Sequence, residues 1–443
     1  MSPNRSDLED RLTLAELQDA WALLPAEDRV DALKELPPAA AQDYFFGLSS
    51  QDQAQVVLAF PLEERRTWIR ILPPDDAADV VQAAPADDRD GLLAELDDAT
   101  RKEVSALLAY AEDAAGGLMN PRYARMRPDM TVDEAISYLR RQARESPESF
   151  YYVYVLDDQQ RLLGVVSFRE LFSANPQARV RDIMHADVVT VTDQMDQELV
   201  SRVFQEHRLT AIPVVDATGG MKGIVTADDI VDVVREEATE DIQKLGGVQA
   251  LDEPYMNVGF FEMIRKRAVW LVVLFVGEML TATAMTHYQD EIARAVVLAL
   301  FIPLIISSGG NSGSQASTLV IRAMALGEVG LRDWWRVVRR EFFSGLVLGG
   351  LLGALGFLRI IVYQRIDPIY GPHYIRIAFT LFASLIGVVT FGTLAGSLLP
   401  FLLRSLKLDP ASASAPFVAT LVDVTGLVIY FTVASLLLRG SLL

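Results

Sequence analysis

Five long apolar segments in the second half of the chain restrict its possible folds more than any other feature of the sequence. They cover Ala268–Tyr288, Ala293–Ala325, Phe342–Tyr363, Ile377–Leu403 and Pro416–Leu438. Bilayer hydrocarbon is roughly 30 Å thick, and a helix of about 20 residues crosses it. Each segment is therefore long enough to span a membrane, and the sequence predicts an α-helical transmembrane domain of five spans over residues 268–443.

The second segment is longer than a span requires, so we expect it to be tilted, to be bent or to lie partly outside the membrane core. Pro303 and the glycine-rich residues 309–313 are the expected points of bending. The basic links between spans set the orientation: Arg265–Arg267, Arg332–Arg340 and Arg404–Lys407 all fall on one side, which the positive-inside rule makes cytoplasmic. We therefore expect a multi-pass protein of the inner (plasma) membrane, with its amino terminus inside and its carboxy terminus outside.

The net negative charge of the protein comes from the part of the chain before Ala268. The formal net charge of the 443 residues is −19, whereas residues 268–443 contain 12 Lys or Arg and 9 Asp or Glu. Such a region repels the phosphates of nucleic acid, so cations are its expected partners. The absence of cysteine excludes disulfides, thiolate metal sites and thiol catalysis. The opening MSPNRSDLED is polar, so no secretory signal peptide is expected and the acidic part should stay in the cytoplasm.

Residues 24–108 repeat with a period of 12, and a proline often follows the repeated apolar position. Proline suits the first turn of a helix because its missing N–H has no partner there, and the acidic residues that follow suit the helix dipole. Stacked helix-and-turn units of this kind form a superhelix, with a plain helical bundle as the alternative. The sequence predicts an all-α superhelical domain over residues 1–118. The repeated positions are Leu24, Leu36, Leu48, Phe60, Leu72, Ala84, Leu96 and Leu108.

Residues 119–237 contain one pattern twice: a β-branched strand, a turn, a second strand that ends in Ser or Thr, and a helix with an acidic start. The pattern resembles a tandem pair of CBS (cystathionine β-synthase type) domains, which implies an α+β fold. Such pairs frequently bind adenine nucleotides, so the resemblance makes ATP or another adenine nucleotide an expected ligand. Residues 238–267 are predicted to form a connecting helix. The predicted strands cover 151–156, 162–167, 211–216 and 221–226, and the candidate nucleotide contacts are Ser167, Glu170, Thr226 and Asp229.

Asp423 lies near the middle of the last span, and a carboxylate inside a span usually marks an ion pathway. At helical spacing it shares a face with the small or polar residues Ala419, Thr420 and Gly426, which suits a water-lined seam. Mg²⁺ keeps several of its waters and is held by one or two carboxylates, so one aspartate per subunit of an oligomer suffices for a pore. The alternative is that Asp423 forms a hydrogen bond with another helix of the bundle.

Two other polar features of the spans each leave two interpretations open. Glu278 in the first span either lines the pore or is protonated and bonded to a Ser or Thr of a neighbouring helix. Residues 307–317, which include Asn311, are polar and rich in glycine, and backbone of this kind at membrane depth is either buried in protein or faces water. They therefore border the pore or allow close helix packing. For the successive GxxxG spacings of the third span, helix packing is the favoured interpretation; these glycines are Gly345, Gly349 and Gly353.

Together, the acidic repeat, the CBS pair, the GGNSGSQAS stretch and PFVATLVDVTGL resemble the MgtE family of magnesium channels over almost the whole chain. The resemblance implies a homodimer with five transmembrane helices per subunit, a pore on the dimer axis, and a cytoplasmic region that closes the pore when it binds Mg²⁺. Asp423 matches the family's pore aspartate. Ser314 and Ala415 depart from the family, which often has Asn at both positions, so their roles stay open. The positions that match the family's regulatory acidic residues are Asp75, Asp79, Asp196, Glu198, Asp229, Asp232, Glu237, Glu240, Asp241 and Asp409.

The charge of the acidic region also predicts gating on physical grounds. Its carboxylates repel one another, and divalent ions that bridge them would hold the domains together, although most of these residues should be solvated surface charges. The chain has four scattered histidines and no phosphate loop or nucleophile motif, so no enzyme is expected. The alternatives to a magnesium channel are a proton- or sodium-coupled divalent-cation carrier and a non-conducting membrane sensor of Mg²⁺ or nucleotide. Mn²⁺, Co²⁺ and Ni²⁺ are further candidate ions.

Overall fold

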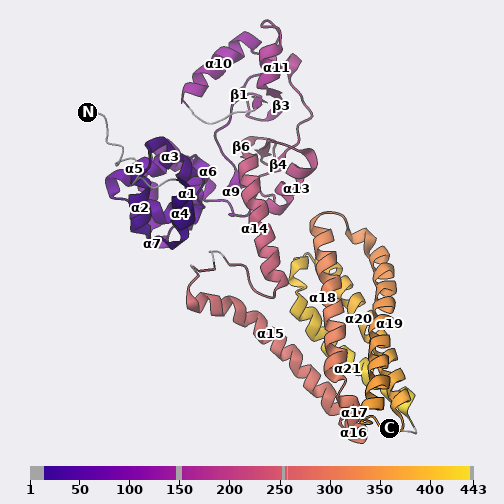
Figure 1. The fold of residues 1–443 in the computed structure, drawn as a ribbon. Coiled ribbons are helices and arrows are strands. Elements are labelled where there is room, and N and C mark those ends of the chain that lie inside the picture. The colour runs from indigo at the N-terminus through magenta and orange to yellow at the C-terminus, as the bar shows by residue number, and fades with distance from the viewer. Residues whose placement is uncertain (1–13, 146–151, 252–254, 257, 440–443) are drawn as a thin grey trace. The chain divides into compact units, whose positions relative to one another are not determined.

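The computed structural model describes residues 14–145, 152–251, 255–256 and 258–439, which fall into two compact units, residues 1–236 and 237–443 (Figure 1). The opening segment, on which the expectation about a signal peptide depends, lies outside the described residues. The first unit combines a helical repeat with an α+β part, and the second unit is helical.

The acidic repeat folds as a stack of short helices. Helices α2 to α8 begin at intervals of 12 residues, so the predicted period is confirmed. Alternate helices pack on each other, α2 on α4, α4 on α6 and α6 on α8, and periodic residues such as Leu36, Phe60 and Leu96 are buried between them. The elements are α1 (Leu14–Ala20), the 3-10 turn η2 (Trp21–Leu23), α2 (Ala26–Glu35), α3 (Pro38–Phe46), α4 (Ser50–Ala59), α5 (Leu62–Arg70), α6 (Pro74–Ala83), α7 (Ala86–Glu95) and α8 (Asp98–Leu107).

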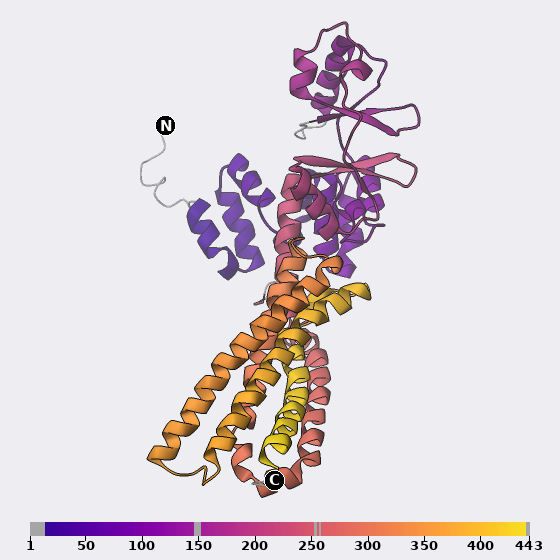
Figure 2. The same ribbon diagram turned by 90° about the vertical axis from the view of Figure 1, so that its right-hand side faces the viewer.

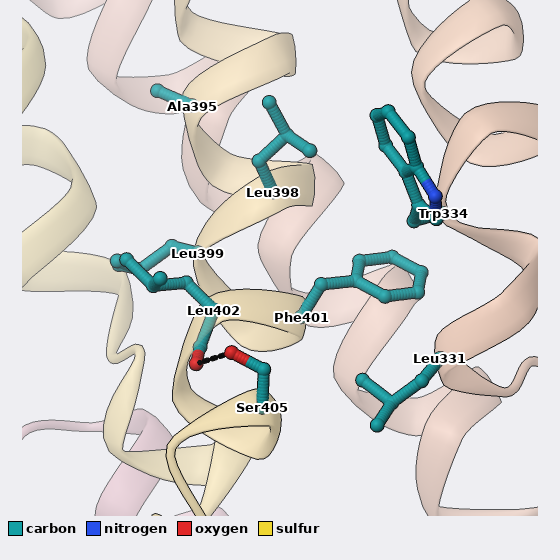
Figure 3. Close-up of a pocket in the computed structure, with 8 residues that line it drawn as sticks. All are labelled: Leu331, Trp334, Ala395, Leu398, Leu399, Phe401, Leu402 and Ser405. Atoms are coloured by element: carbon teal, nitrogen blue, oxygen red, sulfur yellow. Dashed lines mark hydrogen bonds between the residues drawn. The ribbon is translucent and has the colours of Figure 1, made fainter.

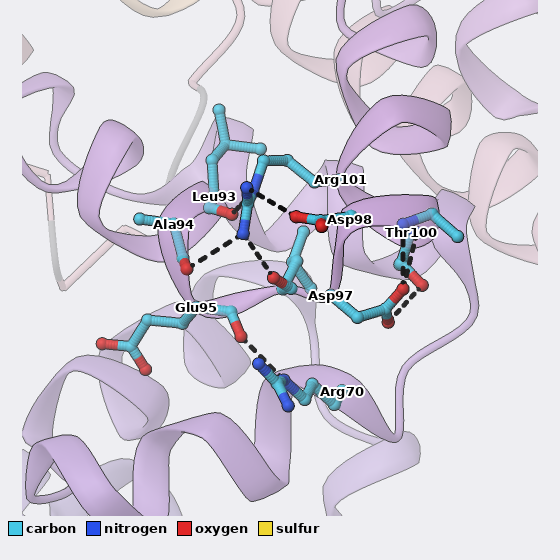
Figure 4. Close-up of polar contacts among 10 residues, drawn as sticks. Arg70, Leu93, Ala94, Glu95, Asp97, Asp98, Thr100 and Arg101 are labelled. Atoms are coloured by element: carbon cyan, nitrogen blue, oxygen red, sulfur yellow. Dashed lines mark hydrogen bonds and ion pairs between the residues drawn. The ribbon is translucent and has the colours of Figure 1, made fainter.

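An arginine in several of these helices binds the carbonyl groups at the end of the preceding helix. In α8, Arg101 donates from Nε to the carbonyl of Leu93 at 2.7 Å and from Nη2 to that of Leu96 at 2.7 Å (Figure 4). The last carbonyls of a helix lack partners within it, so each guanidinium completes a helix end. These arginines occupy equivalent positions of the repeat, a signal that a prediction from apolar residues does not use. The others are Arg29, Arg65 and Arg89.

Replacing Arg101 by Met is expected to destabilise the helical repeat by about 1–2 kcal/mol, because it removes charge-assisted hydrogen bonds to carbonyls and keeps most of the side chain's apolar length. Lys102→Met removes the same charge from the next, exposed position and is the matched control. Proteolysis of the full chain across a urea series measures both unfolding midpoints. Equal midpoints in the two variants would contradict this role for Arg101.

The α+β part has two halves, as predicted, each with a three-stranded sheet. In each half the middle strand pairs parallel with the first strand and antiparallel with the third. The four longer strands match the predicted ones. Strands β1 and β4 have two residues each, too few for an alternating pattern, and were not predicted. The first half contains β1 (Arg125–Met126), α10 (Val132–Glu145), β2 (Tyr152–Leu156), β3 (Leu162–Ser167) and α11 (Phe168–Ser173); the second contains α12 (Val180–Ile183), β4 (Val191–Thr192), α13 (Gln197–His207), β5 (Ala211–Val215), β6 (Met221–Thr226) and α14 (Ala227–Leu245).

The segment that precedes the first half packs on the second half. Helix α9 (Ala115–Leu118) contacts β4, β6 and α13. Asn120 exchanges two backbone hydrogen bonds with Ile224 of β6, at 2.7 and 2.9 Å. One hydrophobic core runs from the helical repeat into the second half. A boundary at residue 119 therefore does not separate two folded bodies, because the backbone N–H groups of Ala115 and Gly116 bond Met195 and Asp193 at 2.7 and 2.9 Å and the hydrophobic core crosses it.

The segment predicted as one connecting helix over residues 238–267 is two helix ends joined by a link. Helix α14 continues to Leu245, and the next helix, α15 (Phe260–His287), starts at Phe260. Gly246 and Gly247 follow the end of α14, and Gly247 adopts a φ of +72°, a conformation that favours glycine and stops a helix. The prediction of a continuous helix is wrong for this reason.

Among its described residues, the second unit contains five helices that are long and apolar enough to cross a membrane, so the number of predicted spans is confirmed. The first helix begins at Phe260 rather than at Ala268. The five helices are α15, α18 (Ile302–Ala325), α19 (Trp334–Ile366), α20 (Tyr374–Ser405) and α21 (Ala415–Leu438); α16 (Gln289–Arg294), α17 (Val296–Ala299), η3 (Leu331–Asp333) and η4 (Pro410–Ser412) lie in the links.

The second predicted span is interrupted beside its proline but not at its glycines. Helix α18 starts at Ile302 with Pro303 in its first turn, where a missing N–H costs little. Residues 309–313 do not interrupt the helix, because α18 continues through them. A Cβ placed on Gly392 of α20 would collide with the carbonyl oxygen of Gly309. The glycines thus let two helices approach closely instead of breaking one.

The glycines of α19 serve the same purpose, as predicted. Helices α19 and α20 lie side by side (Figure 2). A Cβ on Gly349 would lie 2.7 Å from the Cα of Ile386, and Gly345 and Gly353 also face the backbone of α20. Gly350, the next residue, faces open space, with no atom within 4 Å of an added Cβ.

Replacing Gly349 by Ala is expected to lower the stability of the membrane unit by about 1–3 kcal/mol, because backbone atoms of α20 cannot move aside cheaply. Gly350→Ala adds the same methyl group one residue away and is expected to be neutral or slightly stabilising, since Ala favours helix over Gly by up to about 1 kcal/mol. Thermal unfolding of both variants in detergent tests this. Equal melting temperatures for the Gly349→Ala and Gly350→Ala variants would disprove the close contact between Gly349 and α20.

Candidate functional site

Asp423 lies where α21 meets two other membrane helices. It is half-buried, and its Oδ1 would lie 3.8 Å from a Cβ placed on Gly310 of α18. The charge of Glu278 on α15 acts on it. Within the described residues, neither carboxylate forms an ion pair with a basic side chain. The structure therefore brings the two acidic residues predicted in separate spans to one place.

Only part of the predicted face of α21 is open. Thr420 is partly exposed beside Gly277 of α15, and Ala419 is partly exposed beside α18. Gly426, in contrast, is buried against Val388 of α20. The missing side chain of Gly426 thus accommodates a neighbouring helix of the same chain, and its place on the pathway stays a prediction.

The polar segment of α18 serves both packing and exposure. Asn311 is exposed and donates from Nδ2 to the hydroxyl of Ser307 at 3.3 Å. The buried Ser317 donates to the carbonyl of Ala413 at 2.9 Å. Ser314 donates to the carbonyl of Ala415 at 3.0 Å, so the two positions that depart from the family pattern contact each other. Neither interpretation of the segment excludes the other, since the two kinds of residue lie on different faces.

An acidic cluster forms between α6 and α14 in the first unit. Burial raises the pKa of Asp75 well above its usual value, and the charges of Asp229, Asp76 and Asp79 raise it further. Burial, with the charge of Asp228, raises the pKa of Asp229 to about 7. These shifts show that carboxylates far apart in the sequence lie close enough to repel each other.

The pKa of other members of this cluster is raised for the same reasons. Burial raises the pKa of Asp79 well above its usual value, helped by the charges of Asp76 and Asp229. It raises that of Asp76 to about 6, helped by Asp228 and Asp232. The sequence analysis had named four members of this cluster, which are Asp75, Asp79, Asp229 and Asp232. It had missed Asp76, Asp228 and Glu236. The available signal was the spacing of acidic residues by about one helical turn along α6 and α14.

The donor chemistry of this cluster fits a divalent cation. Asp75 is only 7% exposed, and its Oδ1 is buried with no hydrogen-bond partner. Carboxylate oxygens are the ligands that Mg²⁺ prefers in proteins. No group of three or more His, Cys, Asp or Glu side chains has metal-binding geometry in the part of the chain that the structure describes. The carboxylates of the cluster thus repel one another, but the described side chains are not already arranged as the ligands of a metal ion.

Other predicted metal ligands have partners within the chain. Asp196 caps the start of α13, and Glu198 pairs with Arg202 at 2.9 Å. Asp409 pairs with Lys244 at 2.6 Å, and Glu240 pairs with the same lysine. Glu237 and Asp241 lie on the same helix, α14. A cation that bound Glu240 or Asp409 would compete with Lys244, a basic residue that the sequence prediction did not consider.

The four predicted nucleotide contacts form two helix caps. The hydroxyl of Ser167 donates to Glu170 at 2.7 Å, and His185 lies 2.6 Å from the same carboxylate. The hydrogen bond from His185 and those from Ser167 lower the pKa of Glu170 to about 2. Thr226 donates in the same way to Asp229 at 2.8 Å. The carboxylates of Glu170 and Asp229 thus each accept a hydrogen bond from the Ser or Thr three residues before them.

Two solved structures are similar to the soluble part. One is a crystal structure of the cytosolic domain of the Mg²⁺ channel MgtE in complex with ATP, at 42% identity over 52% of this chain and 93% of that one, with a TM-score of 0.47. The other is a crystal structure of the soluble part of a magnesium transporter, at 26% identity over 51% of this chain and 93% of that one, with a TM-score of 0.41.

The family models and the curated relatives agree on one family. The model described as a divalent cation transporter (MgtE) matches residues 302–433, the MgtE intracellular N domain matches residues 12–113, and the CBS domain matches residues 115–176 and 180–236. The magnesium transporter MgtE of Thermus thermophilus is 44% identical over 345 residues, which is 78% of this chain and 74% of that protein. That of Enterococcus faecalis is 34% identical over 337 residues, or 76% and 72%. The chain therefore belongs to the MgtE family of divalent cation transporters.

Proposed function

We propose that the chain forms a magnesium-selective channel of the inner membrane, which mediates Mg²⁺ uptake and closes when cytoplasmic Mg²⁺ binds its acidic region. The two relatives described above are magnesium transporters. The observation that carries the proposal to this chain is the position of Asp423, half-buried in a membrane helix beside a second carboxylate and without a basic partner among the described residues.

This arrangement of Asp423 suits a hydrated cation better than a structural contact. A carboxylate that served only to hold helices together would need a basic or hydrogen-bonding partner, since an unpaired charge inside a membrane is costly. A divalent ion that keeps its water supplies that partner as it passes. Glu278 adds negative charge to the same place, so the pathway attracts cations and repels anions.

A homodimer would complete the pathway. Asp423 stays partly exposed in a single chain although α15 and α18 lie near it, and the exposed Asn311 lies on α18 as well. Helix α15 leaves most of its apolar residues outside the packing of the chain, among them Val272, Phe275 and Met279. Lipid and a second subunit would cover these surfaces, with one Asp423 from each subunit facing the pore.

The proposed orientation places the soluble part in the cytoplasm and the carboxy terminus outside. Trp270 of α15 bonds Ser414 before α21 at 3.1 Å. Near the end of α20, Phe401 shares a hydrophobic cluster with Val337 of α19, and Leu403 shares another with Ala413 before α21. These contacts support an arrangement in which the segments share one end of the membrane unit. The link from the soluble part enters there, because Gly247 packs against Trp270. The basic residues of α19 and of the preceding link belong to the same end, as the positive-inside rule requires of a cytoplasmic face.

The acidic cluster would sense Mg²⁺. Asp75, Asp79 and Asp229 are the residues that would hold the ion, with Asp76 and Asp232 beside them. The cation would supply positive charge that cancels the mutual repulsion of these carboxylates and keeps α6 on α14. Loss of the cation would let α6 and α14 move apart. Helix α14, which leads to the membrane unit, would then be free to move.

This cluster favours a cation over a nucleotide as the ligand of Asp229. The negative charges around Asp229 would repel a triphosphate. Adenine nucleotide binding to the CBS pair stays a prediction from the resemblance. Ser167 and Glu170 of the first half are the more favourable position for it, because fewer carboxylates surround them than surround Asp229.

Magnesium flux tests the proposal. The purified full chain in liposomes should admit Mg²⁺ at low internal magnesium and admit much less at millimolar internal magnesium. A current that reverses at the magnesium equilibrium potential, whatever the proton or sodium gradient, indicates a channel. A reversal potential that follows either gradient would instead indicate a coupled carrier, and no flux under any condition would indicate a sensor.

A further inference from the structure

Three arginines at the start of α19 and an apolar surface further along the same helix, here called the floor, line an open cavity of about 880 Å³. The arginines are Arg336, Arg339 and Arg340, and the floor includes Phe343 and Val347. No step of the proposed transport uses these residues. A cavity with a strongly basic rim and an apolar floor needs a ligand that matches both.

Helical spacing turns this surface away from the rest of the chain. Residues 339 and 340 lie three and four positions after 336, residue 343 lies four and three positions after them, and 347 follows 343 by four, so the five residues share one face of α19. Gly345 and Gly349 lie on the opposite face, against α20. Phe343 is 59% exposed and Val347 is 72% exposed. The cavity therefore opens toward the surroundings of the bundle.

Two tryptophans set the depth of the arginines in the membrane. Helix α19 begins with Trp334 and Trp335, and tryptophan concentrates at the headgroup level of bilayers. Trp334 lies beside a separate cavity of about 550 Å³ whose lining includes Leu398 and Phe401 of α20 (Figure 3). The arginines follow within two turns, and their long side chains reach back to the headgroups while Phe343 lies at the depth of acyl chains.

The charge of these arginines is not neutralised within the described part of the chain. Arg339 and Arg340 form no ion pair there, although Glu341 adjoins Arg340 in sequence and interacts with it at longer range. Arg336 pairs with Asp333 at 3.8 Å with a side chain that is 87% exposed. The start of a helix already carries a partial positive charge, so cations gathered there are unfavourable unless an anion is present.

We propose that this surface binds an anionic phospholipid, with the phosphate on Arg336, Arg339 and Arg340 and an acyl chain along Phe343 and Val347. Guanidinium groups bind phosphate through paired hydrogen bonds, and the apolar floor matches only a phosphate that carries a hydrocarbon chain. Clusters of basic residues next to the membrane end of a helix attract anionic lipid headgroups in this way. The site does not depend on the proposed transport of magnesium; only the leaflet follows from the proposed orientation.

Native mass spectrometry of the full chain in detergent tests the site, with dioleoylphosphatidylglycerol as the anionic probe and dioleoylphosphatidylcholine as the neutral one. We expect tighter binding of phosphatidylglycerol, weakened between about tenfold and a hundredfold by the triple variant Arg336→Gln, Arg339→Gln, Arg340→Gln. The matched control removes the same charge from exposed arginines at the other end of the unit: Arg359→Gln, Arg365→Gln, Arg376→Gln. The corresponding triple change to Lys keeps the charge and should retain most of the binding, which separates lost recognition from lost folding.

Several results would overturn the proposal. Equal binding of the two lipids, or equal loss in the two glutamine variants, would mean that lipid coats the chain without a specific site. Competition by glycerol 3-phosphate at the affinity of phosphatidylglycerol would identify a site for free phosphate. A change in the mass of the assembly in the first variant alone would identify the arginine surface as a contact between subunits.

Discussion

Replacing Asp423 by Asn is expected to reduce magnesium flux at least about a hundredfold while the protein stays folded and keeps its oligomeric state. Charges of +2 and −1 about 6 Å apart, with a water between them, attract by roughly 5 kcal/mol at an effective dielectric constant of about 20. Removal of that attraction exceeds the roughly 3 kcal/mol that corresponds to a hundredfold change. The amide keeps the shape of the side chain, so packing against Gly310 is unchanged. Asp423→Ala is expected to have the same effect.

Flux into liposomes, together with size-exclusion profiles, measures this effect. Asp367→Asn removes the same charge from an exposed link between α19 and α20 and is expected to leave flux unchanged. The flux of the Glu278→Gln variant shows whether the second carboxylate contacts the ion in the pathway or only adds negative electrostatic potential there. Flux at the wild-type level in monodisperse Asp423→Asn would remove Asp423 from the pathway.

Neutralising the acidic cluster is expected to abolish closure by magnesium. In the variant Asp75→Asn, Asp79→Asn, Asp229→Asn, the ion loses its ligands, and we expect conduction to persist at millimolar internal magnesium. The opposite sign is also physically possible, since the change removes repulsion that ion loss would otherwise release. Bridging should dominate, because a divalent ion shared by several buried carboxylates couples more strongly than charges screened over about 8 Å.

Flux at low and high internal magnesium, with protease protection of the soluble part, distinguishes the two outcomes. The matched control is Asp87→Asn, Asp88→Asn, Asp90→Asn, which removes three charges from exposed positions of α7. A cluster variant that stays shut at low magnesium would mean that repulsion dominates. Unchanged protection by magnesium would place the sensor elsewhere. The predicted acidic residues outside the cluster would then be tested; they are Asp196, Glu198, Glu237, Glu240, Asp241 and Asp409.

The sequence by itself determined the features that depend on local pattern. The 12-residue period places every helix from α2 to α8, because one apolar position per unit must be buried between alternate helices. Apolar length determines the five membrane helices, because bilayer thickness is constant. The cost of a charge in hydrocarbon marks Asp423 without knowledge of its neighbours. Strands of five or six residues were also predicted from their runs of β-branched apolar residues, whereas β1 and β4, with two residues each, are too short for such a run.

Only the tertiary structure decided which distant residues meet. Asp75 and Asp229 are 154 positions apart, and they repel each other because the fold brings their carboxylates close together. Gly426 was expected to face water because helical spacing places it near Asp423, but spacing does not reveal that α20 covers that part of the face. The glycines of α18 were expected to bend the helix, but a close partner helix uses the space they leave. Periodicity describes one element at a time, whereas burial, repulsion and close contact belong to pairs of elements and appear only once the chain is folded.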